Sequence, residues 1–234
     1  MPKQTARKSV LVIDDEAQIL GAIADTLADE FEVMIASSPL IGIRLLEKNP
    51  NYSVVISDQR MPEMTGDEFL ARAREVSPAT RLMITGYADL EAVIRAVNLG
   101  QIFGYISKPW NPEHLKLAVI KAAEHHELVQ NMETERRLLH NLMYNMPDGR
   151  FFKDLENRFV RVNKVHAARY KVARPEDMIG KTRKDFMSAD HARVLEAEDA
   201  EIVRTGTALT DRGGQTESDA ELFRWYSTTK APVK

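Results

Sequence analysis

Five short apolar runs separated by amphipathic stretches place the strongest restriction on how the first half of this chain can fold. The runs are VLVI at 10–13, FEVMIA at 31–36, SVVIS at 53–57, RLMIT at 81–85 and IFGYI at 102–106. Runs of this length, bounded by turn or acidic residues, are typical of strands buried on both faces, and the segments between them are long enough for crossover helices. Residues 1–124 are therefore predicted to form an α/β unit of the (βα)5 type, with a doubly wound parallel sheet.

Length and composition limit the remaining possibilities. At 234 residues the chain exceeds the usual size of one domain, about 100–200 residues, so two domains are expected. The net charge of −3 comes from 35 acidic and 32 basic residues mixed along the chain, which predicts no direct nucleic-acid partner and no membrane partner. Without cysteine, disulfides, thiolate metal sites and cysteine nucleophiles are excluded. No stretch approaches the ~18 apolar residues of a membrane span, and the N-terminus is too polar for a signal peptide, so a cytoplasmic location is expected.

Charged and hydroxyl side chains follow four of the five apolar runs. The first run ends in Asp14 and Asp15, the third in Asp58, the fourth in Thr85 and the fifth in Lys108. Chemistry in an open parallel sheet belongs at the carboxyl ends of the strands, beside the switch point. Two carboxylates ~4 Å apart repel by about 4 kcal/mol at an effective dielectric of about 20, so a cation must compensate them, most simply Mg²⁺. Asp58 could then attack phosphorus as a nucleophile while the metal and Lys108 offset the developing charge.

Each of these residues taken alone has a simpler structural interpretation. Asp14 and Asp15 could favour the N-terminus of a helix, and Asp58 could be a turn residue. Tyr105 could be a core residue, and Lys108 could lie in a solvated loop. A reactive site is indicated only where these residues lie together.

The same residues, together with Met61-Pro62 and Gly66 in the following loop, make residues 8–124 resemble the receiver domain of bacterial two-component response regulators. The resemblance implies that Asp14 and Asp15 hold Mg²⁺ and that Asp58 is both a metal ligand and the phosphoacceptor. Arg60 would offer its backbone carbonyl to the metal.

The resemblance also implies a switch and a partner. Thr85 matches the hydroxyl that turns toward the phosphoryl group, Tyr105 the aromatic that moves inward with it, and Lys108 the lysine that pairs with the phosphate. The phosphoryl donor would be a sensor histidine kinase or a phosphotransfer protein. Arg60 is a bulky charged residue at a position that influences phosphate lifetime in this family.

An enzymatic alternative is a Mg²⁺-dependent phosphohydrolase with Asp58 as its nucleophile. Haloacid-dehalogenase-like phosphatases place a second acid two residues after the nucleophile to serve the leaving group. Arg60 stands at that position here, which disfavours turnover and favours a regulator that is not itself an enzyme.

A long helix is predicted over residues 113–146, between Asn111-Pro112 and Pro147. It would be ~50 Å long, with its first turns completing the receiver and residues 125–146 forming a signalling linker. A heptad seam interrupted by Glu135 predicts a modest parallel homodimer, and its apolar members are Leu128, Met132, Leu139, Leu142 and Met146.

The stretch HHEL at 125–128 is similar to the phosphoacceptor segment of histidine kinases. It lacks the Arg-Thr-Pro that usually follows. A solvated helix face is therefore favoured for His125 and His126 over a phosphoacceptor role.

From residue 147 the pattern changes to short strands and helices. RFFKDLENRFVRVN reads as two strands joined by a turn, and it is followed by a helical KVHAARYKV, a turn at RPEDMIGKT and a helix across HARVLEAEDAEIVRTG. This order resembles a PAS domain over residues 142–234, which implies an α+β fold with an antiparallel sheet. Such domains sense small ligands or pair with copies of themselves.

The residues identify no ligand for the PAS domain, so its ligand is left as unknown or none. The lack of cysteine excludes a flavin adduct or a thioester-linked chromophore, and residues 194–204 contain no histidine of the kind that usually binds haem. His166 and His191 could approach a pocket, although lone histidines are more often surface or capping residues. Dimer coupling is the favoured role, and a ligand sensor with a merely structural receiver is a further alternative.

The closing segment LFRWYSTTKAPVK is predicted to supply one strand that lacks the partner of a final strand pair, which would expose an open edge. We therefore expect the PAS domain at 147–234 to be incomplete and an output domain to be missing. A cyclic-di-GMP synthase or hydrolase is the first expectation for that output, and a histidine kinase the second. The overall expectation is a phosphorylation-controlled response regulator that passes its signal through the helix to the PAS domain.

Overall fold

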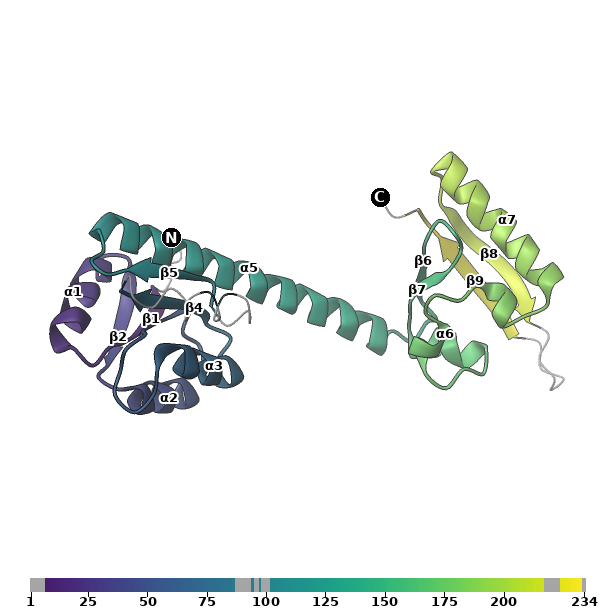
Figure 1. The fold of residues 1–234 in the computed structure, drawn as a ribbon. Coiled ribbons are helices and arrows are strands. Elements are labelled where there is room, and N and C mark those ends of the chain that lie inside the picture. The colour runs from purple at the N-terminus through teal and green to yellow at the C-terminus, as the bar shows by residue number, and fades with distance from the viewer. Residues whose placement is uncertain (1–6, 87–93, 95–96, 98–101, 217–223, 233–234) are drawn as a thin grey trace. The chain divides into compact units, whose positions relative to one another are not determined.

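The computed structural model describes residues 7–86, 94, 97, 102–216 and 224–232. The chain divides into two compact units, residues 1–135 and residues 136–234 (Figure 1). The first unit has one sheet with two hydrophobic clusters, and the second has two strand pairs with one hydrophobic cluster.

The first unit is a five-stranded parallel sheet with helices on both faces (Figure 1). The strand order is β2-β1-β3-β4-β5, and the strands are β1 Lys8–Ile13, β2 Phe31–Ala36, β3 Val54–Asp58, β4 Thr80–Thr85 and β5 Gly104–Ser107. The helices are α1 Ala17–Leu27, α2 Pro39–Lys48, α3 Gly66–Val76 and α5 Pro112–Asn145. The predicted doubly wound (βα)5 fold is confirmed, while the crossover between β4 and β5 lies largely outside the described residues.

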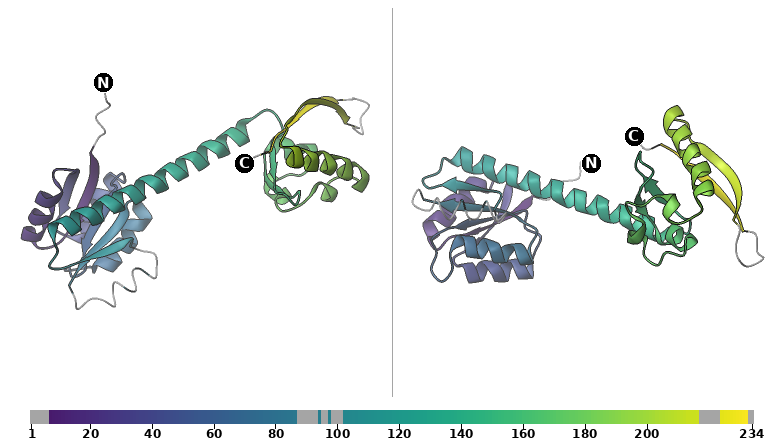
Figure 2. Two further views of the ribbon diagram at one scale, coloured as in Figure 1. Left: turned by 90° about the horizontal axis from the view of Figure 1, so that it is seen from above. Right: turned by 45° about the vertical axis from the view of Figure 1, so that its right-hand side comes forward.

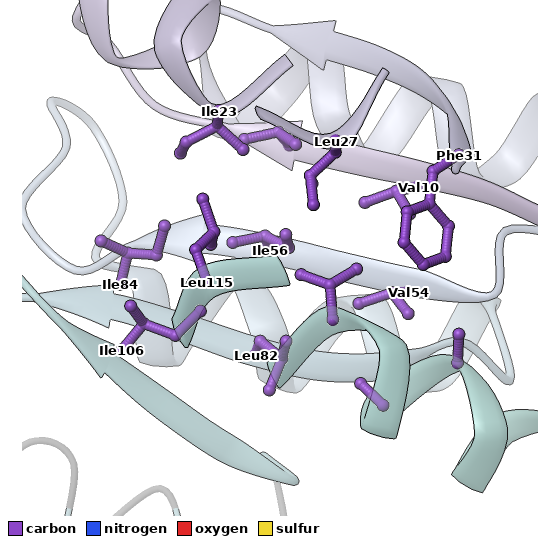
Figure 3. Packing of buried hydrophobic residues seen from close by; sticks show 14 of the residues in the cluster. Val10, Ile23, Leu27, Phe31, Val54, Ile56, Leu82, Ile84, Ile106 and Leu115 are labelled. Atoms are coloured by element: carbon purple, nitrogen blue, oxygen red, sulfur yellow. The ribbon is translucent and has the colours of Figure 1, made fainter. Parts of the chain in front are cut away.

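Alternate residues of the strands supply the two cores. In β1, Val10 and Val12 point to one face and join α1 and α5, whereas Leu11 and Ile13 point to the other face and join α2 and α3. Figure 3 shows the first of these cores, in which Ile23 of α1 and Leu115 of α5 meet the strand side chains. Because both faces are covered, all five residues of β3 are buried, including its last residue, Asp58.

Local sequence signals fix the start of α3, the helix that follows the Asp58 loop. Thr65 precedes α3, and its side chain forms a capping box with Glu68. The backbone amide of Thr65 donates to the Glu68 carboxylate at 3.2 Å. Such reciprocal bonds satisfy amides that a helix N-terminus leaves unpaired, so α3 begins at a defined residue.

The long helix α5 changes character along its length. Its buried residues, Leu115, Val119, Ala122 and Ala123, all lie in the first third and pack on the first unit. Between Leu128 and Tyr144, most of its large apolar side chains are more than half exposed. Met132, Leu139 and Leu142 are examples. No helix in the described part of the chain is both long enough and apolar enough to cross a bilayer.

The second unit contains two antiparallel strand pairs and several helices (Figure 2). Strands β6 Phe151–Lys153 and β7 Phe159–Val162 form one pair, and β8 Leu209–Thr216 and β9 Arg224–Lys230 form the other. Between them come α6 Lys164–Arg169, the 3₁₀ helices Pro175–Met178 and Arg183–Asp185, and α7 Ala189–Thr205. The predicted α+β arrangement with a small antiparallel sheet is confirmed.

The closing strand has an antiparallel partner that the sequence analysis did not identify. β9 pairs with β8 from Leu209 opposite Lys230 to Thr216 opposite Arg224. The partner precedes β9 in the chain, in the segment LTDRGGQT, whose two glycines and polar residues give a weak strand signal.

Candidate functional site

The sheet register brings the predicted site residues to one edge. Neighbouring strands stay paired up to their last residues. Ile13 lies beside Ser57, Asp58 beside Ile84, and Thr85 beside Ser107. Asp14 and Lys108 each follow the last residue of a strand by one position. All four chemical groups therefore leave the sheet at its carboxyl edge, as the strand ends predict.

Lys108 lies between two buried carboxylates at this edge. Its Nζ is 3.0 Å from Oδ2 of Asp14 and 2.5 Å from Oδ1 of Asp58. Asp14 is 1% exposed and Asp58 is 6% exposed, so both carboxylates are largely removed from water. The structure thus joins three of the predicted residues, from β1, β3 and the loop after β5, into one charged cluster.

Burial and charge act in opposite directions on this cluster. Burial raises the pKa of Asp14, against the amide of Glu16 and the ammonium of Lys108, which both lower it. Burial alone would lower the pKa of Lys108, but hydrogen bonds and charges from Asp58 and Asp14 outweigh it and raise that pKa. One ammonium faces two carboxylates, and the exposed carboxylate of Asp15 is next in sequence. The site therefore has an excess of negative charge.

This charge excess fits a hard divalent cation, because the available donors are carboxylate oxygens and backbone carbonyls. In the described part of the chain, however, no three His, Asp or Glu side chains are gathered as a ready metal-binding group. Lys108 is the counter-ion of Asp14 and Asp58 in this arrangement.

The loop after β3 orients the Asp58 carboxylate. The backbone amide of Arg60 donates to Oδ2 of Asp58 at 2.7 Å, which leaves Oδ1 to Lys108. Gly66 closes the loop by donating its amide to the carbonyl of Gln59 at 3.0 Å. A Cβ at Gly66 would lie 2.1 Å from the backbone oxygen of Asp58, so only glycine permits this close approach.

Two residues that support this loop were missed by the sequence analysis. Gln59 is 6% exposed, and its side-chain amide exchanges two hydrogen bonds with Asp67, at 2.9 Å to the carboxylate and 3.1 Å from the backbone amide. The pair fixes the loop against the first turn of α3. A Gln and an Asp eight residues apart carry no recognisable spacing signal, so only the structure reveals them.

Of the two predicted switch residues, Thr85 is the last residue of β4, whereas Tyr105 is the second residue of β5 and lies opposite Met83. Thr85 is 3% exposed, and its hydroxyl donates to the carbonyl of Gly86 at 3.3 Å. Tyr105 in β5 is 51% exposed, so its ring is not part of the core.

His125 and His126 contact the body of the first unit. The ring of His125 lies 4.7 Å from that of Phe103, and Nδ1 of His126 is 3.2 Å from the carbonyl oxygen of Pro78. Burial lowers the pKa of His126. Both line a cavity of about 380 Å³ at the opposite end of β4 from the carboxylates. A purely solvated helix face therefore describes His126 poorly.

The two histidines considered for the second unit differ in environment. His166 is 6% exposed and lies among aromatic rings, with Phe151 at 4.5 Å, Tyr170 at 5.2 Å and Phe159 at 5.8 Å between ring centroids. His191 is exposed at the start of α7. Of the two, only His166 is an interior residue.

Comparisons with known proteins match both units. The family described as "Response regulator receiver domain" matches residues 10–120, and the family described as "PAS fold" matches residues 144–234. The chain is similar to the hydrogenase transcriptional regulatory protein HoxA of Cupriavidus necator, with 45% identity over 117 residues, which are 50% of this chain and 24% of that protein. It is also similar to the regulatory protein AtoC of Escherichia coli K12, with 31% identity over 59% of this chain and 29% of that protein.

The chain is also similar to solved structures, over about half of its length. A response regulator receiver domain protein from Clostridium thermocellum is 34% identical, with a TM-score of 0.50, covering 52% of this chain and 98% of that one. An adenylate cyclase structure from Rhodopirellula baltica is 31% identical, with a TM-score of 0.55, covering 56% of this chain and 98% of that one. The chain spans roughly a quarter of the length of the curated relatives that it matches.

Proposed function

The chain belongs to the response regulator receiver family and carries a PAS fold behind the receiver, and on this premise we propose that Asp58 accepts a phosphoryl group that controls a regulatory protein. The observation that carries the proposal is the cluster of Asp14, Asp58 and Lys108 at the carboxyl edge of the sheet. A buried carboxylate held between an ammonium and a backbone amide is a positioned nucleophile.

The proposed reaction is phosphoryl transfer from a phosphohistidine. An oxygen of Asp58 attacks phosphorus, the P–N bond breaks, and the imidazole nitrogen keeps the bonding electron pair. The donor is a sensor histidine kinase or a phosphotransfer protein. Lys108 is placed to offset the negative charge that gathers on the phosphoryl oxygens, while the Arg60 amide holds the second carboxylate oxygen.

Mg²⁺ is the proposed cofactor, held by the carboxylates of Asp14, Asp15 and Asp58 and by the backbone carbonyl of Arg60. When bound, it would neutralise charge on the carboxylates and the phosphoryl oxygens. The excess of negative charge at the site supports this assignment. The residues' own contribution is to present oxygen donors at one edge and to exclude water from Asp14 and Asp58.

Signal transmission is proposed to begin at Thr85 and Tyr105. The hydroxyl of Thr85 would turn toward the phosphoryl group, and the half-exposed ring of Tyr105 would move inward with it. The change would pass along α5 to the PAS domain, in a homodimer joined through the exposed apolar seam of that helix. The whole regulator would act in the cytoplasm, without direct nucleic-acid contact by this chain.

The main alternative is a Mg²⁺-dependent phosphohydrolase, and Arg60 argues against it. Haloacid-dehalogenase-like phosphatases use a second acid two residues after the nucleophile to serve the leaving group, and an arginine cannot act there as an acid at neutral pH. The curated relatives HoxA and AtoC are called regulatory proteins. Because this chain covers only part of each relative, the output of a longer protein is a prediction.

Beryllofluoride, a phosphoryl mimic, provides a first test of the site. We expect it to bind the wild-type chain only when Mg²⁺ is present, and to perturb the amide signals of Thr85 and Lys108 in NMR spectra. Asp58→Asn should abolish this response, and Asp25→Asn, at an exposed position of α1, should retain it. Binding by Asp58→Asn equal to that of the wild type would show that the site is assigned to the wrong residue.

A further inference from the structure

The residue after the proposed phosphoacceptor makes hydrogen bonds with both its backbone and its side chain. Gln59 is 6% exposed. Its backbone amide donates to the carbonyl of Ile84 at 3.0 Å, and its backbone carbonyl accepts from the amide of Gly66 at 3.0 Å. Its side-chain oxygen accepts from the amide of Asp67 at 3.1 Å, and its side-chain nitrogen donates to the Asp67 carboxylate at 2.9 Å. Gln59 therefore ties the end of β3 both to β4 and to the start of α3.

The start of α3 depends on these bonds. Gly66 and Asp67 are the first two residues of that helix, and a helix N-terminus leaves its first amides without partners inside the helix. Gln59 accepts from both of these amides, one with its backbone oxygen and the other with its side-chain oxygen. A single residue at the strand end thus pairs two amides that the helix cannot pair, beside the capping box of Thr65 and Glu68.

The peptide unit between Gln59 and Arg60 connects these bonds to the reactive carboxylate. Its carbonyl accepts from the amide of Gly66, and its own amide donates to Oδ2 of Asp58 at 2.7 Å. Because a peptide unit is planar and rigid, a tilt of its carbonyl also tilts its amide. The side-chain bonds between Gln59 and Asp67 hold the start of α3 against that carbonyl. They therefore act on the orientation of the Asp58 carboxylate through one rigid group.

The loop between Gln59 and Asp67 contains an unfavourable backbone conformation. Glu63 has a φ of 71°, in the left-handed region that residues other than glycine rarely adopt. Such a conformation persists only when the surrounding structure holds it. The bonds from Gln59 to Gly66 and Asp67 close this loop at its two ends. They are therefore in a position to keep the loop, and the Arg60 amide within it, in one conformation.

We propose that Gln59 and Asp67 are positioning residues for phosphoryl transfer to Asp58. They act through the Gln59–Arg60 peptide, whose amide keeps Oδ2 of Asp58 in place while Oδ1 faces Lys108. This role rests on the proposed function and adds to it two residues outside the charged cluster of Asp14, Asp58 and Lys108. Loosening the pair should slow phosphoryl transfer although every residue of that cluster is unchanged.

Exchanging the two side-chain chemistries gives a matched set of variants. In Gln59→Glu a carboxylate faces the carboxylate of Asp67 where a hydrogen bond was, so the rate of phosphorylation should fall. In Asp67→Asn the side-chain oxygen can still accept from Gln59, so the rate should stay near that of the wild type. The double variant Gln59→Glu/Asp67→Asn again places a donor opposite an acceptor, with the direction of the bond reversed. It should therefore recover the rate that Gln59→Glu loses.

The rate is measured on the full chain with Mg²⁺ and acetyl phosphate, from the intact mass at successive times. Misplacing a reacting group by about 1 Å can cost about 100-fold in rate, and a loosened peptide moves the carboxylate by less, so we expect Gln59→Glu to be about tenfold slower. The NMR signal of the Arg60 amide should move upfield in Gln59→Glu, as its bond to Asp58 weakens, and return in the double variant. Ile23→Val, buried in α1 away from the loop, should change neither the rate nor this signal.

The outcomes separate this role from the proposed function. If Gln59→Glu does not fold, Asp67→Ala, which removes the acceptor at a half-buried position, takes its place and should be slower than Asp67→Asn. A labelled wild type no faster than these variants, a double variant as slow as Gln59→Glu, an unchanged Arg60 signal, or an equal loss of rate in Ile23→Val would overturn the role of the pair alone. A wild type that takes no label would overturn the proposed function, and this role with it.

Discussion

Replacing Gly66 by alanine should damage both stability and phosphorylation, because this glycine lies directly against the Asp58 backbone. A Cβ there would meet the Asp58 carbonyl oxygen at 2.1 Å, the Asp58 carbonyl carbon at 2.9 Å and the Gln59 Cα at 2.9 Å. These are backbone atoms of the reactive strand end and cannot rotate away. The loop must therefore move by about an ångström, with loss of the hydrogen bond from Gly66 to Gln59.

Overpacking a well-packed site typically costs about 1–3 kcal/mol, and contacts with backbone belong at the upper end. We therefore expect Gly66→Ala to lower the free energy of unfolding by about 3 kcal/mol. Misplacing a reacting group by about 1 Å can reduce rate about 100-fold, which is the loss expected for phosphotransfer. Gly21 is the matched control, since a Cβ there meets nothing within 4 Å in the middle of α1, and alanine should stabilise that helix by about 1 kcal/mol.

Urea unfolding gives the first quantity, and the rate of phosphorylation by acetyl phosphate gives the second. The two variants should differ by about 4 kcal/mol in stability although each adds one methyl group. If Gly66→Ala is as stable and as reactive as Gly21→Ala, the close approach does not hold the loop and the reasoning fails.

Three further predictions concern charge and the long helix. Burial raises the pKa of Asp14 above 3.8 in the folded chain. Protonated Asp14 therefore stabilises the fold below pH 3.8, and this stabilisation is lost as pH rises through the folded pKa. Asp14→Asn should therefore raise metal-free stability at pH 7 and lose that advantage near pH 3, and a variant less stable than the wild type at pH 7 would contradict this. Burial lowers the pKa of His166 from 6.5 to about 4, so the free energy of unfolding falls by about 3 kcal/mol as pH falls from 6.5 to about 4. Urea unfolding of His166→Phe should lack this pH dependence. The apolar seam of α5 favours pairing with a second copy of the chain, so light scattering at micromolar concentration should show a dimer. Leu139→Glu should disrupt the dimer, and Asn141→Glu, on the outer helix face, should preserve it. A monomeric wild type would contradict this prediction.

The parallel sheet could be predicted because its central strands β1, β3 and β4 are largely buried on both faces and therefore appear as continuous apolar runs. The strand β3 illustrates this, with every residue buried from Val54 to Asp58. The strand β8 could not be predicted in the same way, since LTDRGGQT has no apolar run and its pairing with β9 is set by tertiary context.

The candidate site was predictable to the extent that strand ends carry it. Asp14, Asp58 and Lys108 meet because parallel strands finish at one edge, which is a property of topology. The Gln59–Asp67 pair depends on the path of one loop, and the buried position of His166 depends on which face of a six-residue helix turns inward. Neither carries a periodic signal, so both required the structure.

The central claim is that Asp58 becomes phosphorylated, and intact-mass measurement tests it most directly. The wild-type chain is incubated with Mg²⁺ and acetyl phosphate, weighed, and compared with Asp58→Asn and with a sample in which a chelator has removed the metal. We expect the added mass of one phosphoryl group in the wild type with metal, and none in the other two samples. Full, metal-dependent labelling of Asp58→Asn would contradict it.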